Sequence, residues 1–472
     1  MSRRRELGLL GLLVAVYLLL APGHLYTVDS VEVYRTAESL VRDHDLEIER
    51  PYPLPGVDTK HFHSKYGPLQ ALLATPLYLV GETASRIGLG NFFSRDYPQG
   101  FGGDVHIYFV SLFNVAVTAL TALVLARILA RLGYAPAVQV QVALIYGLAT
   151  MALNQARDFF QHPLETLLLL LAFAAVLAFR QEGRPLWALA TGAALGAALL
   201  TRLTSALVWP AYAMALAWAL PAARSKARAI VGFVVPLLVA ASLQLAYNQI
   251  RYASPWRFGY LSMDDAQGFS TPLGHGLAGN LLSAGRGLFL YAPPLVVALA
   301  MGPRFLARHR APALLALAQA AAFLVVSSTW WDWAGGWCWG PRLILAALPA
   351  LFLPLALVLS EGTRSERGLL AATVAAGVLV ALLGALVDYN SIYWTWAQMK
   401  LHPADAYLWQ PSLSPVVMHA KALTGGAPLD LWLADLVRRR GLPTGLATGL
   451  PLVALGATSL ALVLRRDRDE IA

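Results

Sequence analysis

Apolar residues occur along the whole chain in long stretches that short polar turns separate. Each stretch has roughly the 20 residues that an α-helix needs to cross the hydrocarbon core of a bilayer. The pattern predicts an all-α integral membrane protein, a single polytopic helical bundle of about 12 spans over residues 1–472. We expect the spans near residues 7–24, 106–131, 137–155, 163–180, 186–201, 204–221, 229–248, 287–303, 311–328, 341–360, 368–387 and 443–464.

Two apolar segments have alternative interpretations. The first apolar run follows the basic start MSRRR and could be a signal peptide, but the residues after it, APGH, make a poor cleavage site. We therefore interpret it as a retained first span. Residues 67–82 are apolar but short, and they contain Pro68 and Pro76. This combination favours an interfacial or re-entrant helix over a span.

The composition supports a membrane protein, since 57% of the residues are hydrophobic and only 13% are charged. A soluble globular protein usually carries about 25% charged residues. The net charge of +9 would suggest nucleic-acid binding in a soluble protein, but here Lys and Arg cluster in the turns between apolar runs. Membrane topology explains those clusters, so we expect no nucleic-acid partner. The only cysteine, Cys338, excludes an internal disulfide and a cysteine-based metal site.

Basic residues in the short turns predict the orientation of the bundle. If the spans alternate, the clusters fall on one side, which the positive-inside rule assigns to the cytoplasm together with both termini. They are Arg3–Arg5, Arg127/Arg131, Arg180/Arg184, Arg224/Lys226/Arg228, Arg304/Arg308/Arg310, Arg364/Arg367 and Arg465/Arg466/Arg468. The long loops, near 25–105, 249–286, 329–340 and 388–442, then lie outside the cell. A bias towards Ala, Leu and Arg suggests a bacterial genome, so we expect a bacterial cytoplasmic membrane and an extracytoplasmic active site.

The first long loop, 25–105, is expected to carry juxtamembrane helices and an acidic site. Residues 28–42 fit an amphipathic helix with Val33, Ala37, Leu40 and Val41 on one stripe and with Arg35 and Glu38 pointing away from it. Asp29 heads the apolar stripe, and Glu32 lies one turn further along. An ionised carboxylate just above the membrane can accept a proton from an attacking hydroxyl. The alternative is the first turn of an ordinary surface helix, where acids are common.

Four cationic residues in the outer loops are candidates for binding a phosphate group. Lys65 precedes Tyr66 at a junction between loop and helix, Arg202 lies in an outer turn, and glycines flank Arg286. Arg342 follows a run that has five Trp within ten residues. Arginine forks and lysines suit phosphate oxygens. The alternatives are a flexible glycine turn and arginines at the level of the lipid headgroups.

Tyr66 and two further groups of outer residues are candidates for a sugar or acceptor pocket. His162 and Glu165 lie one turn apart at the start of a span, where an ionisable group indicates function unless it only caps the helix. Trp331, Asp332 and Trp333 combine flat aromatic faces with a carboxylate, as sugar binding requires, although an interfacial aromatic belt has the same composition. His61 and His63 would be half of a metal site, and no third ligand is indicated. We therefore assign no metal ligands and no certain cofactor, and a divalent metal is left open as an alternative that the sequence does not indicate.

Several of these segments resemble the GT-C superfamily of membrane glycosyltransferases, which use polyprenyl-phosphate sugars. The first span followed by DSVE, then SKYGPLQALLATPLYLVG and a pair of membrane helices, is similar to that group, which includes the protein O-mannosyltransferase and lipid A aminoarabinose transferase families. The segments NLLSAGRGLFLYAPP and WWDWAGGWCWGPRLILAALP look like those of uncharacterised bacterial members. The resemblance covers residues 25–350, and the region after 388 carries little signal.

The resemblance implies an inverting transfer, in which an acid of the first loop deprotonates the acceptor hydroxyl. Asp29 matches the position of that acid, and Glu32 is second. His162 stands where related sequences often have an acid, and Glu165 is the candidate substitute. The resemblance also implies that Lys65, Arg202, Arg286 and Arg342 include the residues that bind the donor phosphate, with two of them expected to contact it.

The residues support the same chemistry without the family. A lipid phosphate enters sideways from the outer leaflet, so its enzyme needs outward-facing cations at headgroup depth and an acid above them. The partners would be a polyprenyl-phosphate sugar, membrane lipid, and a glycan, lipid or protein acceptor. The main alternative is a transporter or lipid-linked sugar flippase, but the chain shows neither paired repeats nor charges deep within the spans. An envelope scaffold would not explain carboxylates opposite a cluster of outer arginines.

Overall fold

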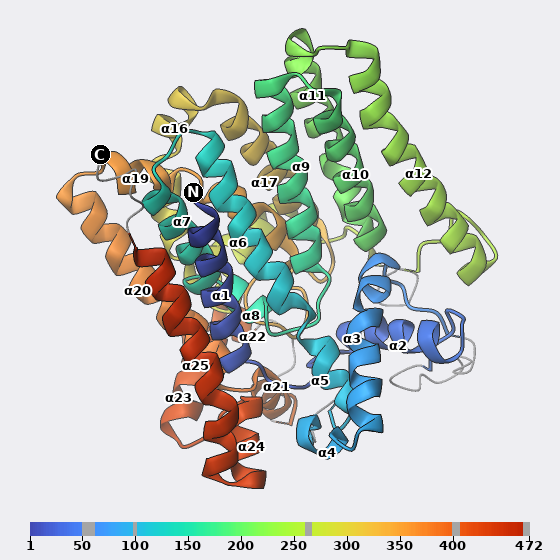
Figure 1. The fold of residues 1–472 in the computed structure, drawn as a ribbon, viewed down its shortest axis with the longest axis vertical. Coiled ribbons are helices and arrows are strands. Elements are labelled where there is room, and N and C mark those ends of the chain that lie inside the picture. The colour runs from blue at the N-terminus through green and yellow to red at the C-terminus, as the bar shows by residue number, and fades with distance from the viewer. Residues whose placement is uncertain (50–61, 98–101, 260–266, 399–405, 466–472) are drawn as a thin grey trace.

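The computed structural model describes residues 1–49, 62–97, 102–259, 267–398 and 406–465. Within these ranges the regular structure is helical, apart from isolated bridge residues that include the antiparallel pair Ile48 and Phe62. Figure 1 shows the long helices side by side, with α2, α3, α4 and α5 below them at the lower right. The expected fold class, an all-α polytopic membrane bundle, is confirmed.

Eight helical stretches in the described part of the chain are long and apolar enough to cross a membrane. They are α5–α6 (Val105–Arg131), α9 (His162–Glu182), η1–α11–η2 (Leu203–Ala222), α12 (Lys226–Tyr252), α17 (Arg310–Thr329), η4–α18–α19 (Arg342–Glu361), α20 (Arg364–Leu386) and α25 (Leu442–Leu464). Each corresponds to a span expected from the apolar pattern, with ends that differ by a few residues.

The remaining expected spans correspond to shorter or interrupted helices. Three of them are α1 (Arg3–Leu19), α7 (Pro136–Leu148) and α10 (Pro185–Thr201). The span expected near 287–303 is divided into α14 (Leu288–Tyr291) and α15 (Pro294–Ala300), and α16 (Gly302–Arg308) follows. Pro293 and Pro294 cause the division, because a proline has no amide hydrogen and clashes with the preceding helical turn.

The composite spans and the outer layer contain further helices. The composite spans consist of α5 (Val105–Ser111), α6 (Phe113–Arg131), η1 (Leu203–Val208), α11 (Trp209–Ala219), η2 (Leu220–Ala222), η4 (Arg342–Ala347), α18 (Leu348–Leu351) and α19 (Leu355–Glu361). The other helices are α2 (Val28–Arg42), α3 (Leu69–Arg86), α4 (Gly90–Phe93), α8 (Ala152–Gln155), α13 (Leu273–Leu282), α21 (Tyr389–Gln398), α22 (Ala406–Trp409), η5 (Pro411–Leu413), α23 (Pro415–Thr424) and α24 (Trp432–Arg440).

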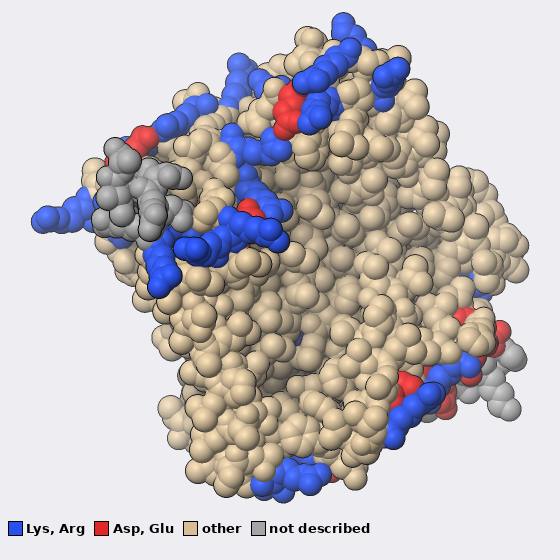
Figure 2. All heavy atoms as spheres, in the orientation of Figure 1, with Lys and Arg blue, Asp and Glu red and all other residues tan. Residues whose placement is uncertain are grey.

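The basic turns come together at one end of the bundle. The Arg5 guanidinium donates to the carbonyl oxygen of Arg465 at 3.0 Å, so the start of α1 lies beside the end of α25. Other turns are joined by the ion pairs Arg127–Glu6, Arg131–Glu182, Arg304–Glu366 and Arg308–Glu361. Figure 2 shows Lys and Arg atoms gathered at the upper end, above a broad belt with very few charged atoms. The belt is the part of the surface that suits the hydrocarbon core of a bilayer.

Close packing of small residues fixes the position of the C-terminal end of α10. A Cβ atom at Gly192 would overlap the carbonyl oxygen of Phe233, so α10 and α12 approach at backbone distance. Helices in membranes associate in this way because small residues allow extensive van der Waals contact. The contact fixes α10, and therefore Arg202, which caps its C-terminal end.

The amphipathic helix expected at 28–42 is present as α2, with the same bounds. Val33 and Ala37 are buried, as the apolar stripe indicated. Glu38 was expected to point away from the core, and the structure corrects this. Its side chain is buried, accepts a hydrogen bond from Tyr78 Oη at 3.3 Å and pairs with Arg35. Partners on α2 and α3 compensate the burial of this charge.

A buried ionic cluster ties the C-terminal region to the first loop. The Asp430 carboxylate lies 2.9 Å from His24 Nε2 and 2.9 Å from Arg95 Nη1, and it also accepts a hydrogen bond from Tyr26. A buried carboxylate needs such partners because desolvation penalises the charge. Asp430, in a region that carried little signal in the sequence, therefore packs against the first loop.

Candidate active site

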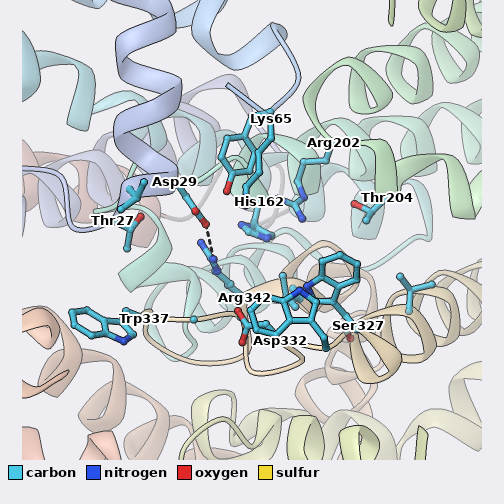
Figure 3. Close-up of a pocket in the computed structure, with 18 of the residues that line it drawn as sticks. Thr27, Asp29, Lys65, His162, Arg202, Thr204, Ser327, Asp332, Trp337 and Arg342 are labelled. Atoms are coloured by element: carbon cyan, nitrogen blue, oxygen red, sulfur yellow. Dashed lines mark hydrogen bonds and ion pairs between the residues drawn. The ribbon is translucent and has the colours of Figure 1, made fainter. Parts of the chain in front are cut away.

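A cavity of about 770 Å³ opens where the long loops meet the ends of the spans (Figure 3). Its volume is in the range typical of ligand-binding sites. Eight residues that the sequence singled out line it: Asp29, Lys65, Tyr66, His162, Arg202, Trp331, Asp332 and Arg342. Four others do not belong to its lining: Glu32, Glu165, Arg286 and Trp333. Segments from most of the chain therefore converge on one site.

Asp29 faces the cavity from the first turn of α2. The Thr27 side chain caps this helix by accepting a hydrogen bond from the Ser30 amide, and the Ser30 hydroxyl donates to Asp158 at 2.9 Å. The Asp29 carboxylate then lies 2.7 Å from Arg342 Nη2, and 29% of its side chain is exposed (Figure 3). Burial would raise the pKa of Asp29, but Arg342 and then Lys65 lower it to about 2. Asp29 is therefore an ionised carboxylate that solute can reach.

Glu32 lies behind Asp29 and positions the segment that carries Lys65. One Glu32 carboxylate oxygen accepts from the Ser64 hydroxyl at 3.3 Å and from the Lys65 amide at 3.4 Å. Glu32 is only 7% exposed to solvent. Burial raises the pKa of Glu32 to about 7, with Lys65 opposing the shift and Asp29 adding to it. Because Glu32 does not line the cavity, we assign it a positioning role in place of the second catalytic role expected.

The raised pKa of Glu32 predicts a specific pH dependence of stability. Between pH 4.5 and 7 the folded chain holds a proton on Glu32 that the unfolded chain has lost, so this group lowers stability as pH rises. The loss is on the order of 3 kcal/mol over that window. We expect Glu32→Gln to remove this part of the dependence, so the melting temperature of the variant exceeds that of the parent at pH 8 and not at pH 5. Equal differences at both pH values would contradict the assignment.

A close backbone contact places Lys65 and Tyr66 beside Arg202. A Cβ atom at Gly67 would overlap the carbonyl oxygen of Leu200, so the segment before α3 touches the end of α10. The Gln161 side chain also donates to the Gly67 carbonyl at 3.1 Å. The Lys65 ammonium lies 5.7 Å from the centre of the Tyr66 ring. Only a glycine permits this approach, which brings two cations from distant parts of the sequence together.

Glu165 is buried beneath the cavity and orients Arg202. Its carboxylate lies 3.1 Å from Arg202 Nε, and it accepts hydrogen bonds from the hydroxyls of Ser205 at 2.7 Å and Thr204 at 3.0 Å. Glu165 is 1% exposed, so it does not touch a ligand in the cavity. We therefore assign Glu165 to positioning Arg202 and not to the sugar or acceptor pocket.

His162 and Arg342 present unused polar atoms to the cavity. Both ring nitrogens of His162, and Nε and Nη1 of Arg342, are buried and have no hydrogen-bond partner within the described ranges. A side cavity of about 10 Å³ also touches both residues, together with Asp29 and Arg202. The Arg342 guanidinium stacks 3.9 Å from the centre of the Phe160 ring, which holds its plane in place. Unsatisfied buried donors are costly, so this arrangement favours a polar ligand.

Arg286 does not reach the cavity, contrary to the role expected for it. Its guanidinium donates to the carbonyl oxygens of Ala334 at 2.8 Å and Gly336 at 2.6 Å, and to the Tyr393 hydroxyl. Gly336 has a φ of +66°, and this turn directs carbonyl oxygens inward, where they need a donor. Arg286 is fully buried and holds the tryptophan-rich loop in shape. Its neighbouring glycines allow close contacts within the fold, Gly285 with Leu408 and Gly287 with Ser283.

Trp333 packs within the fold and does not face a sugar. It is 5% exposed, and a Cβ atom at Gly279 of α13 would overlap its ring. Trp331 and Asp332, its neighbours in the same loop, line the cavity. The sequence marked the loop correctly but could not assign directions to its side chains, because the loop has no regular period.

Replacement of Arg286 is expected to cause a large loss of stability, because its guanidinium holds two backbone carbonyl oxygens. Arg286→Gln removes donors from two buried carbonyl oxygens, each of which costs about 1–3 kcal/mol when unsatisfied. We expect the melting temperature in detergent to fall clearly. Arg257→Gln, which changes an exposed arginine of the neighbouring loop, provides the control and should melt like the parent. A stable Arg286→Gln protein with weakened donor binding would restore the role first expected for Arg286.

Several lining residues were not expected from the sequence. Asn390 and Trp394 come from α21, one turn apart on the face that looks into the cavity. The Asn390 amide also donates to the backbone carbonyl of Tyr26, so α21 is tied to the first loop. The only available signal was the aromatic run YNSIYWTW, which has the four-residue spacing of one helix face.

The described residues contain no group of three or more His, Cys, Asp or Glu side chains arranged to hold a metal ion. His63, considered as half of such a site, lies with Nδ1 2.9 Å from the carbonyl oxygen of Leu46. His61, the other half, is outside the described residues.

Comparisons with known proteins identify the fold. No family model matches the sequence, and no curated protein matches it. The structure of ArnT from Cupriavidus metallidurans bound to undecaprenyl phosphate is similar, with a TM-score of 0.52, 19% identity, and coverage of 95% of this chain and 75% of that one. AglB from Archaeoglobus fulgidus and EmbB from Mycobacterium smegmatis each give a TM-score of 0.46, at 13% identity, and this chain covers 58% and 42% of their lengths. The chain therefore has the fold of this ArnT structure.

Proposed function

We propose that this chain is an inverting glycosyltransferase that moves a sugar from a polyprenyl-phosphate donor to an acceptor hydroxyl. The observation that carries the proposal is the meeting of one accessible carboxylate, Asp29, with Lys65, Arg202 and Arg342 in a single cavity. A base and a cationic site for a phosphate leaving group are the two parts that such a transfer needs. The similar ArnT structure contains undecaprenyl phosphate, which supports a lipid phosphate as the donor here.

The cavity lining suits the three parts of that donor. Apolar side chains from the neighbouring spans and loops offer a surface for the lipid: Leu203, Phe258, Phe269, Phe323, Val326 and Leu343. The cations and the unpartnered nitrogens of Arg342 and His162 suit the phosphate and the hydroxyls. Trp331 and Asp332 provide the aromatic face and the carboxylate expected for a sugar.

In the proposed reaction the acceptor oxygen attacks the anomeric carbon as Asp29 takes its proton. The bond between the anomeric carbon and the phosphate oxygen breaks, and the electron pair leaves with the polyprenyl phosphate. Fixed guanidinium groups stabilise that charge most strongly in the transition state, where it develops. Arg342 also contacts the donor phosphate in this scheme, which weakens its ion pair with Asp29 and so raises the basicity of Asp29.

We further infer that 1–472 is a single membrane domain with both termini in the cytoplasm and the cavity outside. The basic turns support this orientation, since they gather at the end where Arg5 meets Arg465. A reporter fused after the last residue and active only in the cytoplasm tests it. Activity of a reporter that works only outside the cytoplasm would overturn it.

The direct test of function uses the purified full chain with a radiolabelled polyprenyl-phosphate sugar and envelope extract. Transfer of the label to a glycan, lipid or protein supports the proposal, and the labelled product identifies the acceptor class. Movement of the intact labelled lipid across a liposome membrane without transfer would instead establish the flippase alternative. The same assay with free polyprenyl phosphate as competitor shows whether the donor is recognised by its lipid phosphate.

A further inference from the structure

A second cavity lies between α3, α4 and α5, and the residues that line it differ in character from those of the first. Its volume is about 440 Å³, and its lining is almost wholly apolar: Pro76, Leu79, Val80, Thr83, Ala84, Ile87, Leu89, Phe93 and Phe109. We call it the α3 groove. Val80 and Ile87 are 46% and 66% exposed, so the groove is open along its length. An open apolar groove on a membrane protein suits a hydrocarbon chain.

An aromatic cluster lies at one end of the α3 groove. The Trp432 indole at the start of α24 donates to the carbonyl oxygen of Phe93 at 3.0 Å. The Phe93 ring, which lines the groove, lies 5.0 Å from the Tyr108 ring and 5.8 Å from the Trp432 ring. Trp432 and Tyr108 are 4% and 8% exposed, and their residue types are those enriched at the boundary between lipid tails and headgroups.

Three consecutive arginines at the end of α24 lie beside this cluster. Arg438, Arg439 and Arg440 are exposed, and Arg439 Nη1 donates to the carbonyl oxygen of Asn91 on α4 at 3.0 Å. Asn91 is two residues from both Leu89 and Phe93, which line the groove. Among the described residues one acid, Asp435, pairs with these arginines, so this part of the surface keeps an excess of positive charge. Figure 2 shows blue Lys and Arg atoms at the lower end of the molecule, in the region of α24 and α4 in Figure 1.

Membrane topology does not account for these three arginines. α25 begins at Leu442, two residues after Arg440, and ends at Leu464 beside the basic turns. Its 23 residues separate the two ends by roughly 34 Å, about the thickness of the hydrocarbon core. The positive-inside rule concentrates arginines at the other end of α25, so a cluster at this end needs another cause.

We propose that the α3 groove binds an anionic phospholipid, with one acyl chain against Val80 and Leu79 and the phosphate at Arg438–Arg440. The groove supplies apolar surface for the chain, and the arginines supply charge for the headgroup at the depth that the aromatic cluster marks. α24 and α4 belong to the outer layer, so a bound lipid would join that layer to the outer leaflet. This site uses no residue of the Asp29 cavity, and it stands whether or not the chain transfers sugars.

The test is native mass spectrometry of the full chain with phosphatidylglycerol or phosphatidylcholine of identical chains. We expect the tightest site to favour phosphatidylglycerol by about tenfold, since each nearby arginine strengthens binding of an anionic headgroup. Combined Arg438→Gln, Arg439→Gln and Arg440→Gln changes should abolish this preference, and Asp435→Asn should increase it. Equal binding of the two lipids by the parent chain, or a preference that survives loss of the three arginines, overturns the proposal.

A matched pair on α3 tests the acyl-chain part of the site. Val80→Trp fills the groove, while Leu72→Trp places the same side chain at a position of the same helix that is 56% exposed and outside the groove. Val80→Trp should weaken phosphatidylglycerol binding at least about fivefold, and Leu72→Trp should leave it unchanged. Equal effects of the two changes would overturn the assignment of the groove. Both positions face outward, so this pair remains informative if the triple arginine variant does not fold.

Discussion

Asp29→Asn is expected to lower the turnover of sugar transfer by about 10²–10⁴-fold, the contribution usual for a positioned base. The asparagine keeps the shape of the side chain and an oxygen that can accept from Arg342, but it cannot take the proton of the acceptor hydroxyl. Donor binding should persist or tighten, because Arg342 no longer has an anionic competitor for a phosphate. The measurement is turnover and donor affinity of the purified protein with a labelled polyprenyl-phosphate sugar.

Glu38→Gln provides the matched control for this experiment. Glu38 is a buried acid on the same helix as Asp29, but it contacts Tyr78 and Arg35 and does not line the cavity. Its loss should lower stability without a comparable effect on turnover. Undiminished transfer by Asp29→Asn, and by the double variant Asp29→Asn with Glu32→Gln, would exclude both acids as the base.

The apolar pattern was sufficient to predict most of the membrane architecture. Eight of the expected spans match long apolar helices, because a lipid environment requires about 20 apolar residues in a regular helix. The pattern was weaker at the span expected near 287–303. Paired prolines interrupt the helix there, although the hydropathy is continuous.

The candidate site could be predicted by residue type but not by direction. Asp29, Lys65, Arg202 and Arg342 carry charge at the ends of apolar stretches, which is visible in the sequence, and they meet in one cavity. Arg286 has the same sequence character, yet its donors serve backbone carbonyls. Whether an arginine binds a ligand or a turn depends on the φ and ψ angles of a distant loop, and no local pattern reports those angles.

The contribution of α21 was missed because its signal depends on tertiary packing. Asn390 and Trp394 reach the cavity only because Asp430 and Asn390 hold the region after 388 against the first loop. Such contacts join residues more than 350 positions apart in the sequence. Their long-range pairing cannot be derived from a single chain without co-varying positions.

Arg342→Gln is the second change with a large expected effect, because Arg342 contacts Asp29 and presents two further nitrogens to the cavity. Loss of a preorganised cation at a leaving group typically lowers turnover by about 10²–10³-fold. Donor affinity should also fall, in contrast to the outcome for Asp29→Asn. If Asp29→Asn and Arg342→Gln lose similar amounts of turnover but change donor affinity in opposite directions, Asp29 acts as the base and Arg342 binds the phosphate.

The same variant predicts a shift in the pH profile. Arg342 is the largest influence that lowers the pKa of Asp29 to about 2, and burial alone raises that pKa. The base is active when ionised, so activity is lost as pH falls through its pKa. In the parent that loss lies below the pH range of ordinary assays. In Arg342→Gln the acidic limb of kcat/KM should move upward by at least about one pH unit.

Arg367→Gln is the control for the pH measurement, because Arg367 belongs to the basic turns at the opposite end of the bundle. Its profile should overlay that of the parent. If the acidic limb of kcat/KM lies at the same pH in Arg342→Gln as in the parent, Asp29 does not titrate in the rate-determining state. The base would then have to be sought among the other acids at the cavity, of which Asp332, with a pKa that burial raises, is the first to test. With Asp332 as the base, the enzyme would lose activity at a higher pH than with Asp29 as the base. The pH of the acidic limb in the parent therefore separates these two assignments.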